Sequence, residues 1–273
     1  MAKSRRLLTE KLKIIDLVIE VVDARAPLST KNPDFDKMFK HKNRILLLNK
    51  KDLADERVTK LWLEYFKNEG FAVMDFCAVR DNPILLVKAI NKELGPAIEK
   101  YRTKGMNKTL RCVAVGIPNV GKSALLNRIA GSKKLKEGNK PGVTRGLQWI
   151  KLNNNIELLD SPGLLWPKIQ DQDSALKIAL LKSINEDILD KDQLAYGVVD
   201  LFLKKYPKRL IERYKIEDIK GKSSFEVFEA ICKKRGFLMK GGLPDFERAT
   251  NMIIDEFQAG KLGRISLEEP RMV

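Results

Sequence analysis

One motif constrains the fold of this chain more than any other: residues 116–123 match the pattern G-x-x-x-x-G-K-S of a phosphate-binding loop. A mostly apolar stretch, residues 110–115, precedes the motif and predicts a strand, and residues 124–130 after it predict a helix. In that setting the backbone N–H groups of the loop surround a phosphate, and the helix N-terminus adds positive potential. The motif therefore predicts a nucleotide-binding α/β domain, and it does not identify the base.

The residues of this loop have separate expected roles. Lys122 is expected to reach the β- and γ-phosphates and to act in catalysis, and the Ser123 hydroxyl is expected to bind Mg²⁺. Further nucleotide contacts are expected from Asn119, Val120, Gly121 and Ala124.

A second motif follows a predicted buried strand, where residues 49–52 have the pattern N-K-x-D. Guanine carries an N1–H and an N2 amine on one edge, and a single carboxylate can accept both hydrogen bonds, whereas adenine lacks this donor pair. The carboxylate of Asp52 therefore predicts that the base of the bound nucleotide is guanine. We expect Asn49 to bind the N7/O6 edge and to brace the neighbouring loops. The aliphatic part of Lys50 is expected to lie over the ring, with Lys51 in the same loop.

Three further segments are expected to complete the site. Cys77 and Ala78 follow a predicted strand and occupy the place of an S-A loop, whose backbone N–H binds guanine O6; here Cys77 replaces the usual Ser. Thr144 is the candidate for coordinating Mg²⁺, for sensing the γ-phosphate and for a catalytic role. Asp160 begins the sequence D-S-P-G and is expected to hold the Mg²⁺ shell through water, while the Gly163 N–H binds the γ-phosphate.

The order of these motifs is rotated relative to an ordinary small GTPase, in which the phosphate loop comes first and the guanine-binding loops come last. In a doubly wound sheet the ligand loops share the carboxyl ends of parallel strands, so moving the chain termini can leave the site intact. We therefore expect an α/β, circularly permuted P-loop GTPase domain with a doubly wound, mostly parallel sheet over residues 1–168. Beyond it, helical spacing of apolar residues predicts a smaller all-helical domain over residues 169–273.

The balance of charge narrows the class of partner. Lys and Arg number 52 against 36 Asp and Glu, a formal net charge of +16, which favours a polyanionic partner. Basic clusters in the helical part, such as those at Lys204 and Lys233, fit an rRNA-facing surface dominated by phosphate contacts, with solvated helix faces as the alternative. The 3 cysteines are far apart and suit a reducing cytoplasm. We expect no signal peptide and no transmembrane span.

Together with the rotated order, three segments closely resemble the circularly permuted GTPases of the YlqF/RbgA type, which are bacterial ribosome biogenesis factors. The segments are Asp-Ala-Arg-Ala-Pro at residues 23–27, the phosphate-binding loop, and Asp-Ser-Pro-Gly-Leu-Leu-Trp-Pro at residues 160–167. The resemblance extends from the N-terminus to Gly-Arg-Ile-Ser at residues 263–266. It implies that the chain binds GTP and GDP, docks on a late precursor of the large (50S) ribosomal subunit and its rRNA, and hydrolyses GTP when that particle stimulates it. We expect a cytoplasmic monomer.

Two positions bear on hydrolysis. Where an ordinary GTPase has its water-orienting Gln, this chain has Leu164, which has no polar side-chain atom. The resemblance assigns that task to a His within an F-P-G-H-M segment, and Met1 aligns just after it, so we expect either a start upstream of Met1 or another way of hydrolysing GTP. In similar cation-dependent GTPases an Asn at the position of Asn119 helps to bind K⁺ near the phosphates, which implies a K⁺ site here.

The sequence is compatible with two alternative functions from different classes. The first is a GTPase switch in large-subunit assembly, in which Lys122 and Mg²⁺ neutralise the transferring phosphoryl group and Thr144 with Gly163 registers its loss. The second is a nucleotide-gated rRNA-binding protein with negligible hydrolysis of its own. An ATP-dependent kinase is disfavoured, because the N-K-x-D motif argues for guanine and the sequence offers no phospho-acceptor site.

Overall fold

The computed structural model describes residues 2–106, 108–131, 148–153, 155–161, 163–165, 171–184, 191–217 and 219–271. Thr144 and the expected domain boundary at residues 168 and 169 lie outside these ranges, so the roles assigned to them stay predictions.

A six-stranded sheet with the strand order β3-β2-β1-β4-β6-β5 forms the centre of the first part of the chain. Neighbouring strands from β3 to β6 pair in parallel, and β5 runs antiparallel to β6. The strands are β1 (Leu17–Asp23), β2 (Asn43–Asn49), β3 (Ala72–Phe76), β4 (Leu110–Val115), β5 (Gln148–Asn153) and β6 (Ile156–Asp160). The predicted mostly parallel sheet is confirmed.

Helices connect these strands and cover the sheet. Helix α3 begins after Asp55, whose side chain accepts a hydrogen bond from the Val58 N–H and so caps the helix. Helix α5 begins at Lys122 rather than at the expected residue 124, directly after Gly121, which takes a left-handed conformation with φ 92°. The helices of this part are α1 (Ala2–Lys11), the short 3-10 helix η1 (Leu12–Ile14), α2 (Asp34–Met38), α3 (Glu56–Asn68), α4 (Ile84–Arg102), α5 (Lys122–Ala130) and α6 (Gln172–Leu180).

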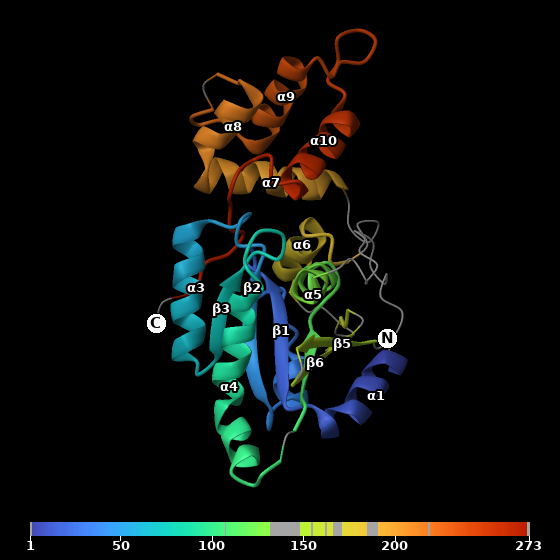
Figure 1. Ribbon diagram of the computed structural model, residues 1–273. Helices are drawn as coiled ribbons and strands as arrows, with labels where there is room; N and C mark the ends of the chain where they lie inside the picture. The colour runs from blue at the N-terminus through green and yellow to red at the C-terminus, as the bar shows by residue number, and fades with distance from the viewer. Residues whose placement is uncertain are drawn as a thin grey trace.

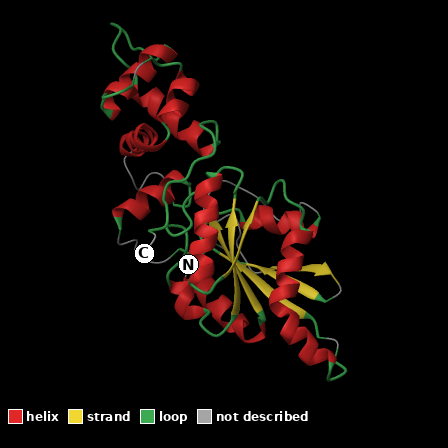
Figure 2. Cartoon of the chain, turned by 90° about the vertical axis from the view of Figure 1, so that its left-hand side faces the viewer, coloured by secondary structure: helices red, strands yellow, loops and turns green. Residues whose placement is uncertain are grey.

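Strand β1 shows why the sheet is covered on both faces. All 7 of its residues are buried, and successive side chains of a strand point to opposite faces. Leu17 and Ile19 join the apolar core that contains residues of α4 and α5, whereas Val18 and Val22 pack in clusters with residues of α1, α2 and α3. Figure 2 shows helices on both sides of the sheet. Burial on both faces explains why this strand has an almost continuous apolar sequence.

The described residues between 191 and 258 form a helical bundle, as predicted. Val198, Phe202, Phe228 and Ile253 are buried in its interior. In Figure 1 the bundle lies at one end of the sheet, and the chain after the last helix runs back to α3. The helices of the bundle are α7 (Lys191–Lys205), α8 (Pro207–Tyr214), α9 (Ser224–Arg235) and α10 (Phe246–Gln258). Across the described part of the chain, no helix is both long enough and apolar enough to cross a membrane.

Candidate nucleotide site

The loops that carry the predicted motifs meet at the carboxyl ends of the parallel strands. The register brings the strand ends together, because Asp23 lies opposite Asn49, Asn49 opposite Phe76, and Ala114 opposite Asp160. Ligands of doubly wound sheets bind at this edge. The loops are the loop after β1, the guanine loop (residues 49–52), the loop after β3, the phosphate loop (residues 116–123) and the loop after β6.

Within the phosphate loop, the lysine binds the loop's own backbone. Lys122 is 7% exposed, and its ammonium group donates to the carbonyl oxygens of Gly116 and Ile117 at 3.1 and 2.9 Å. Burial lowers the pKa of Lys122 to about 8, and the charge of Asp160 acts in the opposite direction. A phosphate would offer this buried ammonium a charged acceptor in place of two neutral carbonyls, which is a stronger interaction.

The guanine loop is joined directly to the phosphate loop. Asn49 Nδ2 donates to the Val120 carbonyl oxygen at 2.8 Å, and Asn49 Oδ1 accepts from the Ala78 N–H at 3.2 Å. Lys50 Nζ donates to the Asn119 carbonyl oxygen at 2.6 Å. The structure therefore brings the predicted residues of three loops into contact, with Asn49 at the centre.

Asp52 is half-buried and lies next to Cys77. Burial raises the pKa of the Cys77 thiol, and a hydrogen bond with the Asp52 carboxylate raises it further. Lys51 is engaged elsewhere, because its Nζ lies 2.8 Å from Asp81 Oδ2 and 3.3 Å from Asp75 Oδ2. The structure thus places Asp52 and Cys77 together and holds the ammonium group of Lys51 beside β3.

A buried ion cluster at the end of β1 is the feature that sequence reasoning missed. Asp23 is fully buried, and it accepts hydrogen bonds from Arg25 Nε at 3.0 Å and from the Arg25 guanidinium NH2 at 2.9 Å. Lys50 Nζ lies 3.1 Å from Asp23 Oδ2. Burial acts to raise the pKa of Asp23, but the charges of Arg25 and Lys50 outweigh it and hold this pKa well below its ordinary value. The signals in the sequence were the pair of opposite charges at the end of an apolar strand and the place of both residues in the segment 23–27, which carries part of the family resemblance.

Asp160, at the end of β6, suits a divalent cation. Its side chain is 1% exposed, and neither carboxylate oxygen accepts a hydrogen bond within the described part of the chain. Burial raises the pKa of Asp160 to about 6, against the opposing charge of Lys122. Burying a carboxylate is costly unless a cation compensates it, and Mg²⁺ prefers oxygen ligands. The residues present, Asp160 and the Ser123 hydroxyl at the start of α5, therefore fit the predicted Mg²⁺.

The loop after β6 packs closely on the phosphate loop. The Leu164 N–H donates to the Gly116 carbonyl oxygen at 3.1 Å. A Cβ atom on Gly163 would lie 2.8 Å from the backbone nitrogen of Pro118, so only glycine allows this approach. The Leu164 side chain is 5% exposed and belongs to the apolar cluster that contains Leu8, which agrees with the prediction that it does not orient water.

Asn119 connects the phosphate loop to the segment that leads toward the helical bundle. It takes a left-handed backbone conformation with φ 59°, and its Nδ2 donates to the carbonyl oxygen of Leu181, directly after α6, at 2.8 Å. The side chain therefore has a protein partner in this structure, and its role toward K⁺ stays a prediction.

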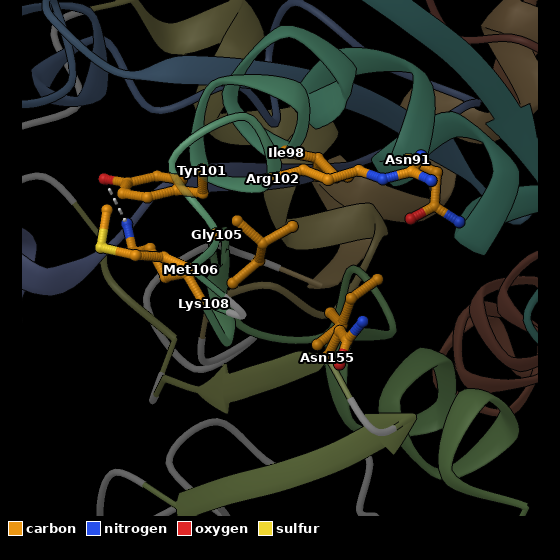
Figure 3. A pocket seen from close by; sticks show the side chains of 10 residues that line it. Asn91, Ile98, Tyr101, Arg102, Gly105, Met106, Lys108 and Asn155 are labelled. Atoms are coloured by element: carbon orange, nitrogen blue, oxygen red, sulfur yellow. Dashed lines mark hydrogen bonds between the residues drawn. The ribbon is translucent and has the colours of Figure 1, made fainter.

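A hollow of about 730 Å³ lies away from this site, at the opposite ends of the strands. Leu110 and Ile156, the first residues of β4 and β6, contribute to its lining. Figure 3 shows the side chains of Tyr101 and Lys108 next to each other at one side of the hollow. Lys108 Nζ is paired with Asp16 Oδ1 at 2.5 Å. Of the residues that the structure describes, none of the predicted nucleotide-binding ones lines this hollow.

Comparisons with known proteins agree with the geometry. The family model described as a 50S ribosome-binding GTPase matches residues 111–230, beginning just before the phosphate loop. The ribosome biogenesis GTPase A of Bacillus cereus is 43% identical over 272 residues, which cover 99% of this chain and 92% of the relative. The crystal structure of GNP-bound YlqF from T. maritima has a TM-score of 0.68 at 31% identity and covers 99% of this chain and 100% of its own. GDP-bound YlqF has a TM-score of 0.70 at 32% identity, over 98% of this chain and 100% of its own.

Proposed function

The chain belongs to the ribosome biogenesis GTPase A family, and from that membership we propose that it hydrolyses GTP as a factor in late maturation of the large (50S) ribosomal subunit. It is a GTPase of ribosome assembly. The large subunit is supported as its target because the matching family model describes a 50S ribosome-binding GTPase.

One observation carries the proposal that the chain recognises GTP through both the base and the phosphates. Asn49 and Val120 are 71 residues apart in the sequence, and they are joined by a buried hydrogen bond of 2.8 Å. This bond sets the loop that carries Asp52 against the loop that carries Lys122. A single guanine nucleotide can therefore contact both loops.

We assign roles to the residues on this basis. Asp52 accepts the N1–H and N2 hydrogen bonds of guanine. The Ala78 N–H, which donates to Asn49 Oδ1 in this structure, would donate to guanine O6 when the nucleotide is bound. Lys122 neutralises charge on the β- and γ-phosphates. The Gly163 N–H binds the γ-phosphate, so loss of this phosphate releases the loop after β6. Asn119 is the candidate ligand for K⁺.

A metal site is proposed at the end of the nucleotide site where the phosphates bind. Ser123 and Asp160 would hold Mg²⁺, with Thr144 as a further ligand. When bound, Mg²⁺ neutralises charge that develops on the transferring phosphoryl group. The buried carboxylate of Asp160, whose oxygens have no hydrogen-bond partner of good geometry among the described residues, is the observation that favours this assignment.

We propose that the helical bundle contacts rRNA. Leu203, Ile211 and Ile219 are among the residues that line a hollow of about 790 Å³ at its surface. Lysine contacts to phosphate release counterions, so binding through this surface should weaken steeply as salt rises. The lysines of the hollow are Lys204, Lys208, Lys220 and Lys222.

Single-turnover hydrolysis of GTP tests this function. Rates are measured with and without large-subunit precursors, in K⁺ and in Na⁺. We expect the particles to raise the rate, and K⁺ to give a higher rate than Na⁺. Nucleotide-dependent binding to the particles with no hydrolysis above the protein-free blank would contradict the proposal and favour the nucleotide-gated rRNA-binding protein.

The base assignment is tested by Asp52→Asn. The amide NH₂ of Asn cannot accept the two guanine hydrogen bonds, so we expect GDP affinity to fall by about 100-fold or more. The matched control is Asp173→Asn, because the Asp173 side chain is 67% exposed and lies on α6. Equal affinity of the unmodified protein for ADP and GDP would refute the guanine assignment.

A further inference from the structure

The chain that follows α10 forms a tail, residues 262–270, that returns to the nucleotide-binding part of the molecule. Figure 1 shows it running from the bundle past the ends of β1 and β2 to α3. Leu262, Ile265 and Leu267 are 3%, 2% and 7% exposed, so the tail is anchored by buried apolar side chains. These anchors place its polar groups against the loops of the site.

The first polar contacts of the tail are with the backbone of residues just before and just after Asp52 in the sequence. The Arg264 guanidinium donates to the Lys51 carbonyl oxygen at 3.0 Å, and Arg264 Nε donates to the Ala54 carbonyl oxygen at 3.2 Å. The Ile265 N–H donates to the Leu53 carbonyl oxygen at 2.9 Å. The backbone before and after Asp52 is therefore held from outside by two consecutive tail residues.

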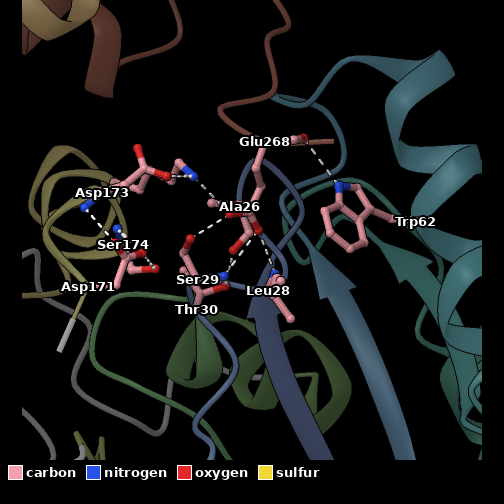
Figure 4. Close-up of polar contacts among 10 residues, drawn as sticks. Ala26, Leu28, Ser29, Thr30, Trp62, Asp171, Asp173, Ser174 and Glu268 are labelled. Atoms are coloured by element: carbon pink, nitrogen blue, oxygen red, sulfur yellow. Dashed lines mark hydrogen bonds and ion pairs between the residues drawn. The ribbon is translucent and has the colours of Figure 1, made fainter. Parts of the chain in front are cut away.

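The next tail residues contact the loop after β1. The Leu267 N–H donates to the carbonyl oxygen of Arg25, the residue whose side chain pairs with Asp23, at 2.8 Å. The Glu268 carboxylate accepts hydrogen bonds from the Leu28 and Ser29 N–H groups at 2.6 and 3.1 Å. Figure 4 shows Glu268 between this loop and Trp62, whose indole N–H donates to the Glu268 carbonyl oxygen at 3.3 Å.

The same tail segment is also attached to the bundle. The Ser266 N–H donates to the Tyr206 hydroxyl at 3.1 Å, and the Arg209 guanidinium donates to the Arg264 carbonyl oxygen. Ser266 Oγ accepts from the Asp55 N–H at 3.3 Å, directly before α3. One short segment of the tail thus contacts both the bundle and the guanine loop.

We infer that residues 264–268 are a positioning element of the guanine site, with Arg264 fixing the loop that carries Asp52. The carboxylate can accept both guanine donors only when the backbone around it is held in place, because hydrogen bonds weaken steeply with distance and angle. Arg264 donates to the backbone carbonyl oxygens of Lys51 and Ala54, so it acts through the loop. This inference rests on the proposed function, in which Asp52 recognises guanine.

A reciprocal effect follows by linkage. If the docked tail increases the affinity for GDP by some factor, bound GDP must favour the docked tail by the same factor. The bundle therefore responds to guanine occupancy through the tail, in addition to the contact between Asn119 and Leu181.

The test compares GDP with inosine diphosphate (IDP), which lacks the N2 amine, in displacement of a fluorescent GDP analogue. We expect Arg264→Ala to reduce the preference for GDP over IDP by about fivefold or more. The control Lys261→Ala changes an exposed residue of the adjoining turn and should leave the preference unchanged. A folded Arg264→Ala variant that keeps the full preference overturns the inference.

Two further measurements separate the possible failures. If Asp52→Asn keeps the GDP preference, the assignment of Asp52 itself is wrong; if only Arg264→Ala keeps it, the role of the tail alone is wrong. Hydrogen exchange on the unmodified protein covers the case in which Arg264→Ala does not fold. Amides of residues 264–268 should exchange about fivefold more slowly with GDP bound, and equal exchange with and without GDP refutes the coupling.

Discussion

Replacing Asp23 by Asn tests how strongly the buried ion cluster supports the site. Asp23 is fully buried and is the shared partner of Arg25 and Lys50, at 2.9 and 3.1 Å. Asn has the same shape but no charge, so the buried guanidinium of Arg25 and the partly buried ammonium of Lys50 would lie beside a neutral group. Because removal of one partner of a buried ion pair leaves an uncompensated charge, we expect the variant to lose about 3–5 kcal/mol of unfolding free energy.

Thermal unfolding of the nucleotide-free protein measures this loss. For a chain of this size, about 2–4 °C is lost per kcal/mol, so the melting temperature should fall by about 6–20 °C. The control Asp173→Asn removes a carboxylate that is 67% exposed, and it should change stability by less than about 0.5 kcal/mol.

The cluster also predicts an effect on nucleotide binding. Burial lowers the pKa of Lys50, and the charge of Asp23 counteracts this. Without Asp23 the pKa of Lys50 would fall further and the lysine would lose the partner that holds it against the phosphate loop. We therefore expect weaker GDP binding by Asp23→Asn at temperatures where the variant is folded. An Asp23→Asn variant as stable as Asp173→Asn would refute the reasoning.

Three further substitutions test the phosphate end of the site. Lys122→Ala should lower the rate of single-turnover GTP hydrolysis by about 100-fold or more, because removing one preorganised group that stabilises transition-state charge lowers a rate by about that factor. A rate within threefold of the unmodified protein would contradict the role of Lys122. Asp160→Asn should raise the Mg²⁺ concentration that GTP binding requires, measured by titration of Mg²⁺ at fixed GTP, and an unchanged requirement would contradict the role of Asp160 in the Mg²⁺ shell. Gly163→Ala should weaken binding of a GTP analogue more than binding of GDP, because its Cβ would lie 2.8 Å from the Pro118 backbone. The control is Gly95→Ala, on α4, where the added Cβ would meet no described atom within 4 Å apart from the helix's own backbone and its chain neighbours; this variant should bind both normally.

The local motifs could be predicted because their chemistry depends on short spacing. Lys122 and Ser123 follow a turn of a few residues into a helix, and that geometry is largely independent of the rest of the chain. The parallel sheet could also be predicted, since continuous apolar strands are typical of a sheet covered on both faces. From these two facts the common location of the loops follows, because carboxyl ends of parallel strands share one edge.

Some side-chain partners could not be predicted. Lys51 lies within the N-K-x-D motif, yet its ammonium group pairs with Asp75 and Asp81 on the neighbouring strand and loop. Asn119 donates to the carbonyl oxygen of Leu181, a contact that no spacing rule indicates. Each of these depends on which segments are adjacent in the folded molecule.

The amino-acid sequence by itself determined the phosphate loop, the guanine motif, the rotated order and the helical C-terminal part. Only the tertiary structure decided that Asp23 is buried between two cations and that Arg264 contacts the backbone of Lys51, 213 residues away in the sequence. The physical reason is that motif geometry depends on neighbouring residues. Burial, and the hydrogen bonds and ion pairs that make it tolerable, depend on which distant segments packing brings together.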